Sequence, residues 1–162
     1  VPVSPRPGGR ARLMAHALAS GRLAHYADAV AELLDLPVEA ARGLLDQVDV
    51  PTSWTSEVPP PAKAFWVPGG PRAAQCVRGF VRIPAGEPFP DHEHLGEERG
   101  LVLAGSFVDA ALGRTLRPGD TFTMPAGTRH QPVVSADGVD LLMLVVVRGG
   151  YKVGEVVLGP RD

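Results

Sequence analysis

The sequence predicts an all-β fold, a small barrel or sandwich of short strands, preceded by a short helical arm. The first observation is a series of short β-rich runs after about residue 74, separated by turn signals. The second is the content of 19 glycines and 17 prolines in 162 residues, which suits many turns better than a helical bundle. The third is an Ala- and Leu-rich segment before residue 50 with helical spacing.

The chain has the size and composition of one core domain with an appendage. Single domains take about 100–200 residues, and the 44% hydrophobic and 21% charged residues are typical of globular proteins. We expect a helical N-terminal arm over residues 1–50, a Pro-rich connector over 51–73 and the barrel over 74–162. The arm begins with residues 1–10, where Pro and Gly predict a disordered lead-in.

The arm is expected to contain two or three short helices. Apolar residues at helical spacing predict one over about 22–35, Pro37 starts another, and a short one is expected over about 11–20. The apolar face of the helix after Pro37 carries Val38, Ala41, Leu44, Leu45 and Val48. Helices this short are unstable alone, so they must pack on another surface.

The connector and the barrel differ in their patterns. Trp54, Phe65 and Trp66 lie among the connector prolines, and we expect them to fix it against the barrel by burial. The expected strands follow the β-rich runs 76–83, 100–104, 106–110, 120–124, 130–134, 140–147 and 154–158.

Charge and cysteine content exclude several classes of protein. The formal net charge of −2 argues against a nucleic-acid or membrane partner. A DNA-reading helix after Pro37 is disfavoured because Asp46 and Asp49 would repel phosphate. No run has the length of a membrane span, and no signal-peptide pattern is found. The single Cys76 forms no intrachain disulfide or Cys-based zinc finger, which fits a cytoplasmic location.

Three of the five histidines occur in an ordered pattern with a glutamate. One segment, from Gly86 to Gly105, reads G-x5-H-x-H-x3-E-x6-G, and a later one reads G-x5-P-x-G-x2-H. His92 and His94 point to the same face if their segment is extended. Glu98 can return to that face from the next strand, and His130 can meet them from a neighbouring one. Three imidazoles and one carboxylate predict a site for a divalent transition metal that leaves positions for water or substrate.

Both segments resemble the paired motifs of the cupin superfamily, which implies a small jelly-roll barrel. The resemblance spans about residues 75–150, and Val134 replaces the Asn that often ends the second motif. Two segments are most similar in sequence to the cupin domain of ChrR-type anti-sigma factors. They are VRIPAGEPFPDHEHLGEERGLVLAGSFVDA and LRPGDTFTMPAGTRHQPV. Nothing in the chain matches the N-terminal zinc-binding domain of ChrR, so a sigma-factor partner is not carried over.

The resemblance implies His92, His94, Glu98 and His130 as ligands of one divalent metal, usually zinc, with iron, manganese, nickel or copper as alternatives. It also implies a homodimer and a small-molecule ligand at the metal. Two functions remain open. One is a regulatory module in which the metal is structural or part of a small-molecule or oxidant sensor. The other is a metal-dependent dioxygenase for a dicarbonyl or hydroxyaromatic substrate, for which no separate catalytic residue is evident.

Several residues keep alternative interpretations. Glu97 competes with Glu98 as a ligand but would point the other way on a strand, and Asp91 and Glu93 should face solvent. His16 and His25 are expected at the helix surface, and Cys76 is expected to be a small buried side chain. The candidates for lining the barrel mouth are Phe80, Arg82, Phe107, Phe122, Met124, Gln131 and Met143. Arg99 should point away from the metal.

Overall fold

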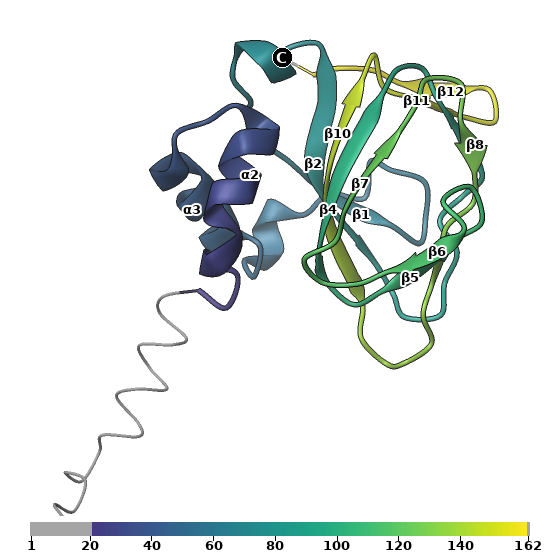
Figure 1. Cartoon of the computed structure of the whole chain (residues 1–162), viewed down its shortest axis with the longest axis horizontal. Helices are drawn as coiled ribbons and strands as arrows, with labels where there is room; N and C mark the ends of the chain where they lie inside the picture. Colours follow the sequence, from purple (N-terminus) through teal and green to yellow (C-terminus); the bar gives the residue numbers. More distant parts are fainter. Residues whose placement is uncertain (1–20, 162) are drawn as a thin grey trace, which may run out of the picture.

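The structure is a computed structural model that describes residues 21–161 of the chain (Figure 1). The expected lead-in over residues 1–10, the helix over about 11–20 and His16 lie outside the described residues. Within residues 21–161, no helix combines the length and the apolar character needed to cross a bilayer.

The described residues form a few short helices followed by many short strands. The helical elements are η1 (Ala24–Tyr26), α2 (Ala27–Leu34), α3 (Val38–Gln47), η2 (Pro51–Ser53) and η3 (Pro71–Ala73). The first strands are β1 (Lys63–Trp66), β2 (Cys76–Ile83), β3 (His92–His94), β4 (Glu98–Ala104), β5 (Phe107–Asp109) and β6 (Arg114–Leu116). The others are β7 (Thr121–Met124), β8 (Arg129–His130), β9 (Val133–Val134), β10 (Leu141–Arg148), β11 (Tyr151–Val153) and β12 (Val156–Leu158).

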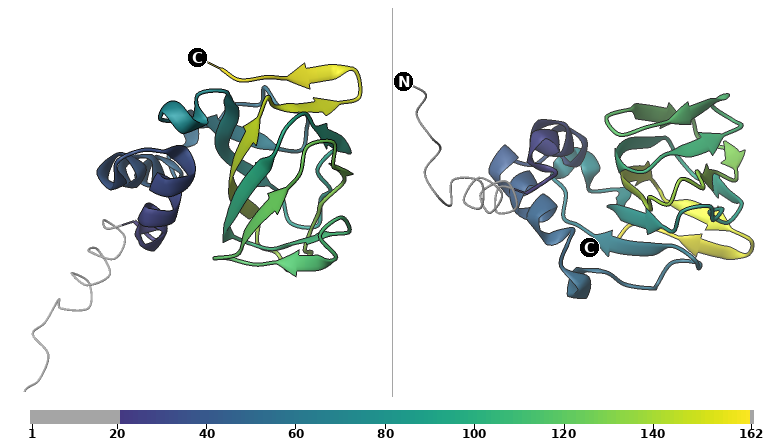
Figure 2. Two further views of the ribbon diagram at one scale, coloured as in Figure 1. Left: turned by 45° about the horizontal axis from the view of Figure 1, so that its top comes forward. Right: turned by 90° about the horizontal axis from the view of Figure 1, so that it is seen from below.

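The strands build a two-sided barrel of antiparallel sheets, which confirms the predicted all-β class. One side is a five-stranded sheet in the order β1-β2-β10-β4-β7. The other side consists of a four-stranded sheet, β12-β11-β3-β8, and a three-stranded sheet, β6-β5-β9. Figures 1 and 2 show the barrel on one side of the molecule and the helices stacked on the outer face of the five-stranded sheet. This arrangement is consistent with a cupin jelly roll.

The five-stranded sheet is buried on both faces. Strand β10 is apolar and buried from Leu141 to Val147 without alternation, as expected for a strand covered on two sides. One core lies between the sheets and includes Phe107, Phe122 and Val145. A second core lies between the sheet and the helices and includes Leu34, Phe80 and Leu144. The described part of the helical arm is therefore packed on the barrel, as its short amphipathic helices require.

A polar contact joins the end of α2 to the connector. Asp35 ends the helix in the left-handed region with φ of 57°. Its carboxylate accepts hydrogen bonds from the backbone N–H of Arg72 at 3.0 Å and from the Arg72 Nε at 2.8 Å. The Gly70 N–H donates to the Leu34 carbonyl at 2.8 Å. A Cβ on Gly70 would lie 2.0 Å from the Asp35 carbonyl oxygen, so the close approach requires glycine.

The connector contributes a strand that the sequence did not predict. Lys63–Trp66 pairs with β2 as an edge strand of the five-stranded sheet. Phe65 stacks on Phe80 with ring centroids 5.7 Å apart, and the Trp54 Nε1–H donates to the Val48 carbonyl at 2.9 Å. These contacts agree with the expected anchoring of the connector by its aromatic residues. The bounds assigned to arm, connector and barrel remain a prediction.

Candidate metal centre

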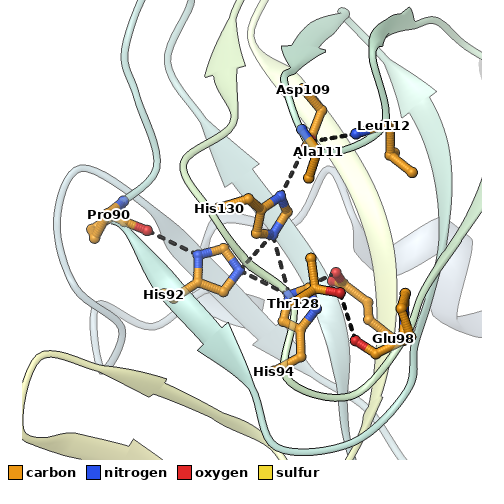
Figure 3. Close-up of polar contacts among 10 residues, drawn as sticks. Pro90, His92, His94, Glu98, Asp109, Ala111, Leu112, Thr128 and His130 are labelled. Atoms are coloured by element: carbon orange, nitrogen blue, oxygen red, sulfur yellow. Dashed lines mark hydrogen bonds and ion pairs between the residues drawn. The ribbon is translucent and has the colours of Figure 1, made fainter.

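The four predicted ligands come from both sides of the barrel and meet inside it (Figure 3). His92 and His94 stand two residues apart on β3, and both imidazoles are buried. His130 lies directly opposite His92 in the register of β8 and β3. Glu98 is the first residue of β4 in the facing sheet and is only 5% exposed. The alternation of β3 and the pairing of β8 therefore direct all three imidazoles at the start of β4.

The donor atoms are closely spaced. The Nε2 atom of His92 lies 3.1 Å from that of His94 and 3.0 Å from that of His130. The Nε2 atoms of His94 and His130 are 3.2 Å apart. The Glu98 Oε2 atom lies 3.0 Å from the His94 Nε2. The three histidines thus offer ligand atoms that all lie within 4.8 Å of one another. The Glu98 carboxylate lies beside His94 and is not part of this close group.

The outer nitrogens of two of these imidazoles determine where their protons are. The His92 Nδ1 lies 2.9 Å from the Pro90 carbonyl oxygen, which only accepts, so this nitrogen carries the proton. The His130 Nδ1 lies 2.5 Å from the Asp109 Oδ2 and carries the proton for the same reason. In a neutral ring with its proton on Nδ1 the Nε2 is bare, and the Nε2 atoms of His92 and His130 lie 3.0 Å apart inside the barrel.

The centre fits a metal cation. Burial lowers the pKa of His92 to about 4, so its imidazole is neutral at physiological pH. Two bare neutral nitrogens cannot hydrogen-bond to each other, and a cation between them satisfies both lone pairs. The Glu98 Oε2 is also buried without a hydrogen-bond partner among the described residues. The donor set and this unpaired carboxylate oxygen both match what a divalent transition metal binds.

The spacing of the nitrogens also bears on the coordination geometry. Nitrogens about 2.1 Å from a metal lie about 3.0 Å apart when they subtend a right angle, and about 3.4 Å apart at the tetrahedral angle. The observed separations of 3.0–3.2 Å are closer to the right angle.

The centre opens into a narrow pocket with an interior volume of about 20 Å³. Its lining contains His92, Glu98 and His130 from the centre. The rest of the lining is mostly apolar and consists of Val81, Phe89, Phe107, Phe122, Pro132, Met143, Val145 and Tyr151. Burial raises the pKa of Tyr151, so its hydroxyl stays protonated and is available as a donor. Three of the four predicted ligands thus line a narrow and mostly apolar pocket.

Comparison with known proteins agrees with this architecture. Residues 79–147, which include all four predicted ligands, match the Cupin_2 family model, described as a cupin domain. This part of the chain is a cupin domain. The predicted resemblance is thereby confirmed.

The chain is similar to a curated relative over part of its length. It is 31% identical over 97 residues to dimethylsulfoniopropionate lyase DddQ of Ruegeria pomeroyi. The match covers 57% of this chain and 47% of DddQ, so the chain spans about half the length of that relative.

Solved structures share the fold at low sequence identity. The structure of Rhodobacter sphaeroides SigE with the anti-sigma ChrR matches with a TM-score of 0.57 and 22% identity, covering 91% of this chain and 69% of that chain. An acetylacetone dioxygenase from Acinetobacter johnsonii matches with a TM-score of 0.54 and 14% identity, covering 67% and 80%. At these identities the likeness shows the fold of the cupin and not its activity.

The structure distinguishes Glu98 from its neighbour Glu97 and shows where the other polar residues near the motif point. Glu98 lies at the centre, whereas the side chain of Glu97 is 57% exposed and lies 4.0 Å from Arg99. Asp91 points outward and pairs with Arg129, whose Nε lies 2.7 Å from its carboxylate. His25 is exposed and Cys76 is buried, as expected for both. The outward direction of Glu97 follows from strand alternation, since Glu98 points inward.

The predicted pocket lining was correct for some residues and wrong for others. Phe107, Phe122 and Met143 line the pocket. Phe80 instead faces the helices, and Arg82 stacks over Trp54 with its guanidinium 4.7 Å from the ring centroid. Two further candidates also lie outside the lining, Met124 because it is buried in the core and Gln131 because it is exposed. On β2 the helix-facing positions alternate with the barrel-facing ones, and the half-buried Arg78 and Arg82 share the parity of Phe80, whereas Val77, Val81 and Ile83 belong to the core between the sheets.

Sequence reasoning missed three residues at or beside the centre. Phe89 packs edge-on against His92 with ring centroids 4.9 Å apart, and Tyr151 lies in register with His94 on β11. Asp109 is 1% exposed and holds His130. The only sequence signal for Asp109 was the G-S-F-x-D wording after the first motif, which indicated resemblance and gave no role.

Proposed function

We propose that this cupin is a metal-dependent enzyme that acts on a small oxygenated molecule bound at the centre. The metal would be held by His92, His94, Glu98 and His130. The observation that carries the proposal is the pocket into which three of these residues open. A purely structural metal is enclosed by its protein ligands, whereas a catalytic metal keeps a position open to substrate.

The pocket lining indicates the kind of substrate. Among the described lining residues, Glu98 is the one acidic side chain and none is Lys or Arg. A negative charge or a polarised oxygen on the substrate would therefore be compensated by the metal, which acts as a Lewis acid when bound. Phe89, Phe122 and Met143 would contact the apolar remainder, and the Tyr151 hydroxyl would donate to a substrate oxygen. Small dicarbonyls, hydroxyaromatics and carboxylates meet these requirements.

The relatives support a catalytic role without fixing the reaction. DddQ is named a lyase for dimethylsulfoniopropionate, a small carboxylate, and a protein of the same fold is named an acetylacetone dioxygenase. We include both chemistries in the test. Zinc, predicted from the resemblance, remains the first metal to examine. Iron, manganese and nickel are examined beside it, because His and Glu side chains are ligands that these metals also accept.

The first experiment measures the metal content of protein purified without added metal, by elemental mass spectrometry. The protein is then reloaded with Fe(II), Mn(II), Ni(II) or Zn(II), and each form is assayed with acetylacetone, a panel of hydroxyaromatics and dimethylsulfoniopropionate. Oxygen uptake reports a dioxygenase, and release of a volatile sulfide reports a lyase. Turnover with one loaded form supports the proposal. Tight binding of one metal without turnover favours a sensor or structural role, and no binding under any loading contradicts the assigned centre.

Matched variants separate catalysis from structure. Glu98→Gln should abolish turnover while the protein keeps its fold, and Glu97→Gln, on the exposed neighbour, should leave turnover unchanged. If the metal is only structural, the main effect of Glu98→Gln should instead be a lower thermal unfolding midpoint. His94→Ala should weaken metal binding severely in either case. Unchanged metal affinity in His94→Ala would show that the ligand assignment is wrong.

A second candidate function is a small-molecule sensor whose output passes through the helices. The observation that favours it is that β4 contributes side chains both to the metal centre and to the core beneath the helices. Glu98 faces the centre, while Leu101 and Leu103 on the same strand belong to the core shared with the helices. A ligand that moves Glu98 would shift the strand on which α2 packs. Binding of a ligand with no turnover, together with altered protease sensitivity of α2, would favour this candidate.

A further inference from the structure

A buried carboxylate links one predicted ligand to a surface hairpin. Asp109 ends β5 and is only 1% exposed. Its Oδ2 accepts a hydrogen bond from the His130 Nδ1–H, with the two atoms 2.5 Å apart. Its Oδ1 accepts from the backbone N–H of Ala111 at 2.8 Å and of Leu112 at 3.1 Å, where the chain turns toward β6. Figure 3 shows these bonds on the side of His130 that faces away from the other imidazoles.

We propose that Asp109 is a positioning residue for the metal centre, which fixes His130 in the tautomer that presents a bare Nε2 to the metal. The inference rests on the proposed metal-dependent function. The same carboxylate clamps the turn after β5, so the orientation of His130 and the shape of this turn are set together. Metal binding at His130 would therefore change the hydrogen exchange of the Ala111 and Leu112 amides in the turn.

The turn alone does not account for an aspartate at this position. Both N–H groups of the turn use one oxygen, Oδ1, which an asparagine would supply equally well. The second oxygen faces an imidazole nitrogen and needs no turn partner. An asparagine in the same pose would point its NH2 group at the His130 Nδ1. That nitrogen would then have to accept, and the proton would move to Nε2, where it blocks metal binding.

The three imidazoles differ in how they are supported. The Nδ1 of His92 donates to a backbone carbonyl, and the Nδ1 of His94 is buried without a partner among the described residues. Of the three Nδ1 atoms, only that of His130 is held by a carboxylate among the described residues. A carboxylate partner raises the basicity of the imidazole and fixes its orientation. His130 is therefore expected to be the best preorganised of the three nitrogen donors, and the one most sensitive to its support.

The test compares Asp109→Asn with a matched control, Asp91→Asn. Asp91 is a suitable control because it is an aspartate next to His92 in the sequence. Its carboxylate accepts from the Arg129 Nε at 2.7 Å and makes no hydrogen bond to an imidazole nitrogen among the described residues. Affinity for Co(II) and Zn(II) is measured by competition with a chelator. Asp109→Asn should weaken binding by about 10–100-fold, the range found when such supporting groups are removed. Asp91→Asn should bind as tightly as the wild type.

A second readout is independent of metal binding. Nitrogen-15 NMR of the metal-free wild type should show the His130 proton on Nδ1, and Asp109→Asn should show it on Nε2. Amide exchange at Leu112 should stay slow in Asp109→Asn, because the turn keeps its acceptor. In the wild type it should slow further when Zn(II) is added.

The outcomes distinguish this inference from the proposed function. If the wild type binds no metal, the proposed function fails, and the NMR tautomer still decides the role of Asp109. If the wild type binds metal and Asp109→Asn matches it in affinity and tautomer, the inference is overturned. If Asp109→Asn does not fold, the wild-type spectrum decides, since a proton on the His130 Nε2 would contradict the positioning role.

Discussion

Replacement of Gly100 by alanine should push an aromatic ring into the pocket of the centre. Gly100 lies opposite Phe122 in the register of β4 and β7. A Cβ on Gly100 would lie 2.1 Å from the Cζ, 2.4 Å from the Cε1 and 2.8 Å from the Cε2 of the Phe122 ring. The ring therefore occupies the space that a side chain at residue 100 would need, and it also lines the pocket.

The size of the effect follows from these distances. Non-bonded carbon atoms are comfortable at about 3.5–4.0 Å, so the ring has to move by roughly 1.5 Å. The ring packs against Phe107, whose ring centroid is 5.8 Å away, and both rings line the pocket. Overpacking of this kind costs about 1–3 kcal/mol of unfolding free energy. At about 2–4 °C per kcal/mol, the thermal midpoint should fall by roughly 2–12 °C.

Urea unfolding monitored by circular dichroism measures this loss in a double-mutant cycle with Phe122→Leu. If the ring is the obstacle, the cost of Gly100→Ala should shrink by about 0.5–3 kcal/mol in the Phe122→Leu background. The control is Gly43→Ala in α3, where nothing lies within 4 Å of the added Cβ. There the same substitution should stabilise the protein by about 0.5–1 kcal/mol. Strictly additive costs at Gly100 and Phe122 would refute the reasoning.

Two further outcomes test the centre and the arm. Removal of metal by a chelator should lower the thermal midpoint in calorimetry, because bound metal at a hundred times its dissociation constant contributes about 2.7 kcal/mol; an unchanged midpoint would argue against a metal at the buried histidines. Phe80→Ala should cost about 3–5 kcal/mol, since Phe80 is fully buried between sheet and helices. Helix and strand signals should still melt together in this variant, and two separate transitions would show that the helices and the barrel unfold independently.

The histidines of the centre could be predicted because their arrangement depends on local rules. His92 and His94 are two residues apart on one strand, and alternation alone places both side chains on one face. The distinction between Glu97 and Glu98 followed from the same rule. The motif spacing then supplied His130, which the structure places beside His92 through the pairing of β8 with β3.

Features that depend on distant pairing could not be predicted. Strand β1 is four residues long and lies among prolines, and it is a strand because β2 offers it an edge. Asp109 meets His130 across 21 residues of sequence, and only the folded barrel, in which β5 pairs with β9, brings the two together. No local pattern distinguishes such an aspartate from one that caps a turn, because Asp109 does both.

The packing of the helices limits how a sensor of this architecture could work. The core between the helices and the sheet contains, among others, Leu23, Val30, Leu34, Leu44, Val48, Phe80, Leu101 and Leu144, all buried. Exposure of each such side chain costs about 1.5–3 kcal/mol, so release of the helices would cost at least as much as the 5–15 kcal/mol that typically stabilises a whole domain. A ligand signal would therefore travel as a small shift of β4 beneath docked helices, and proteolysis of α2 should require global unfolding unless ligand binding first loosens this core.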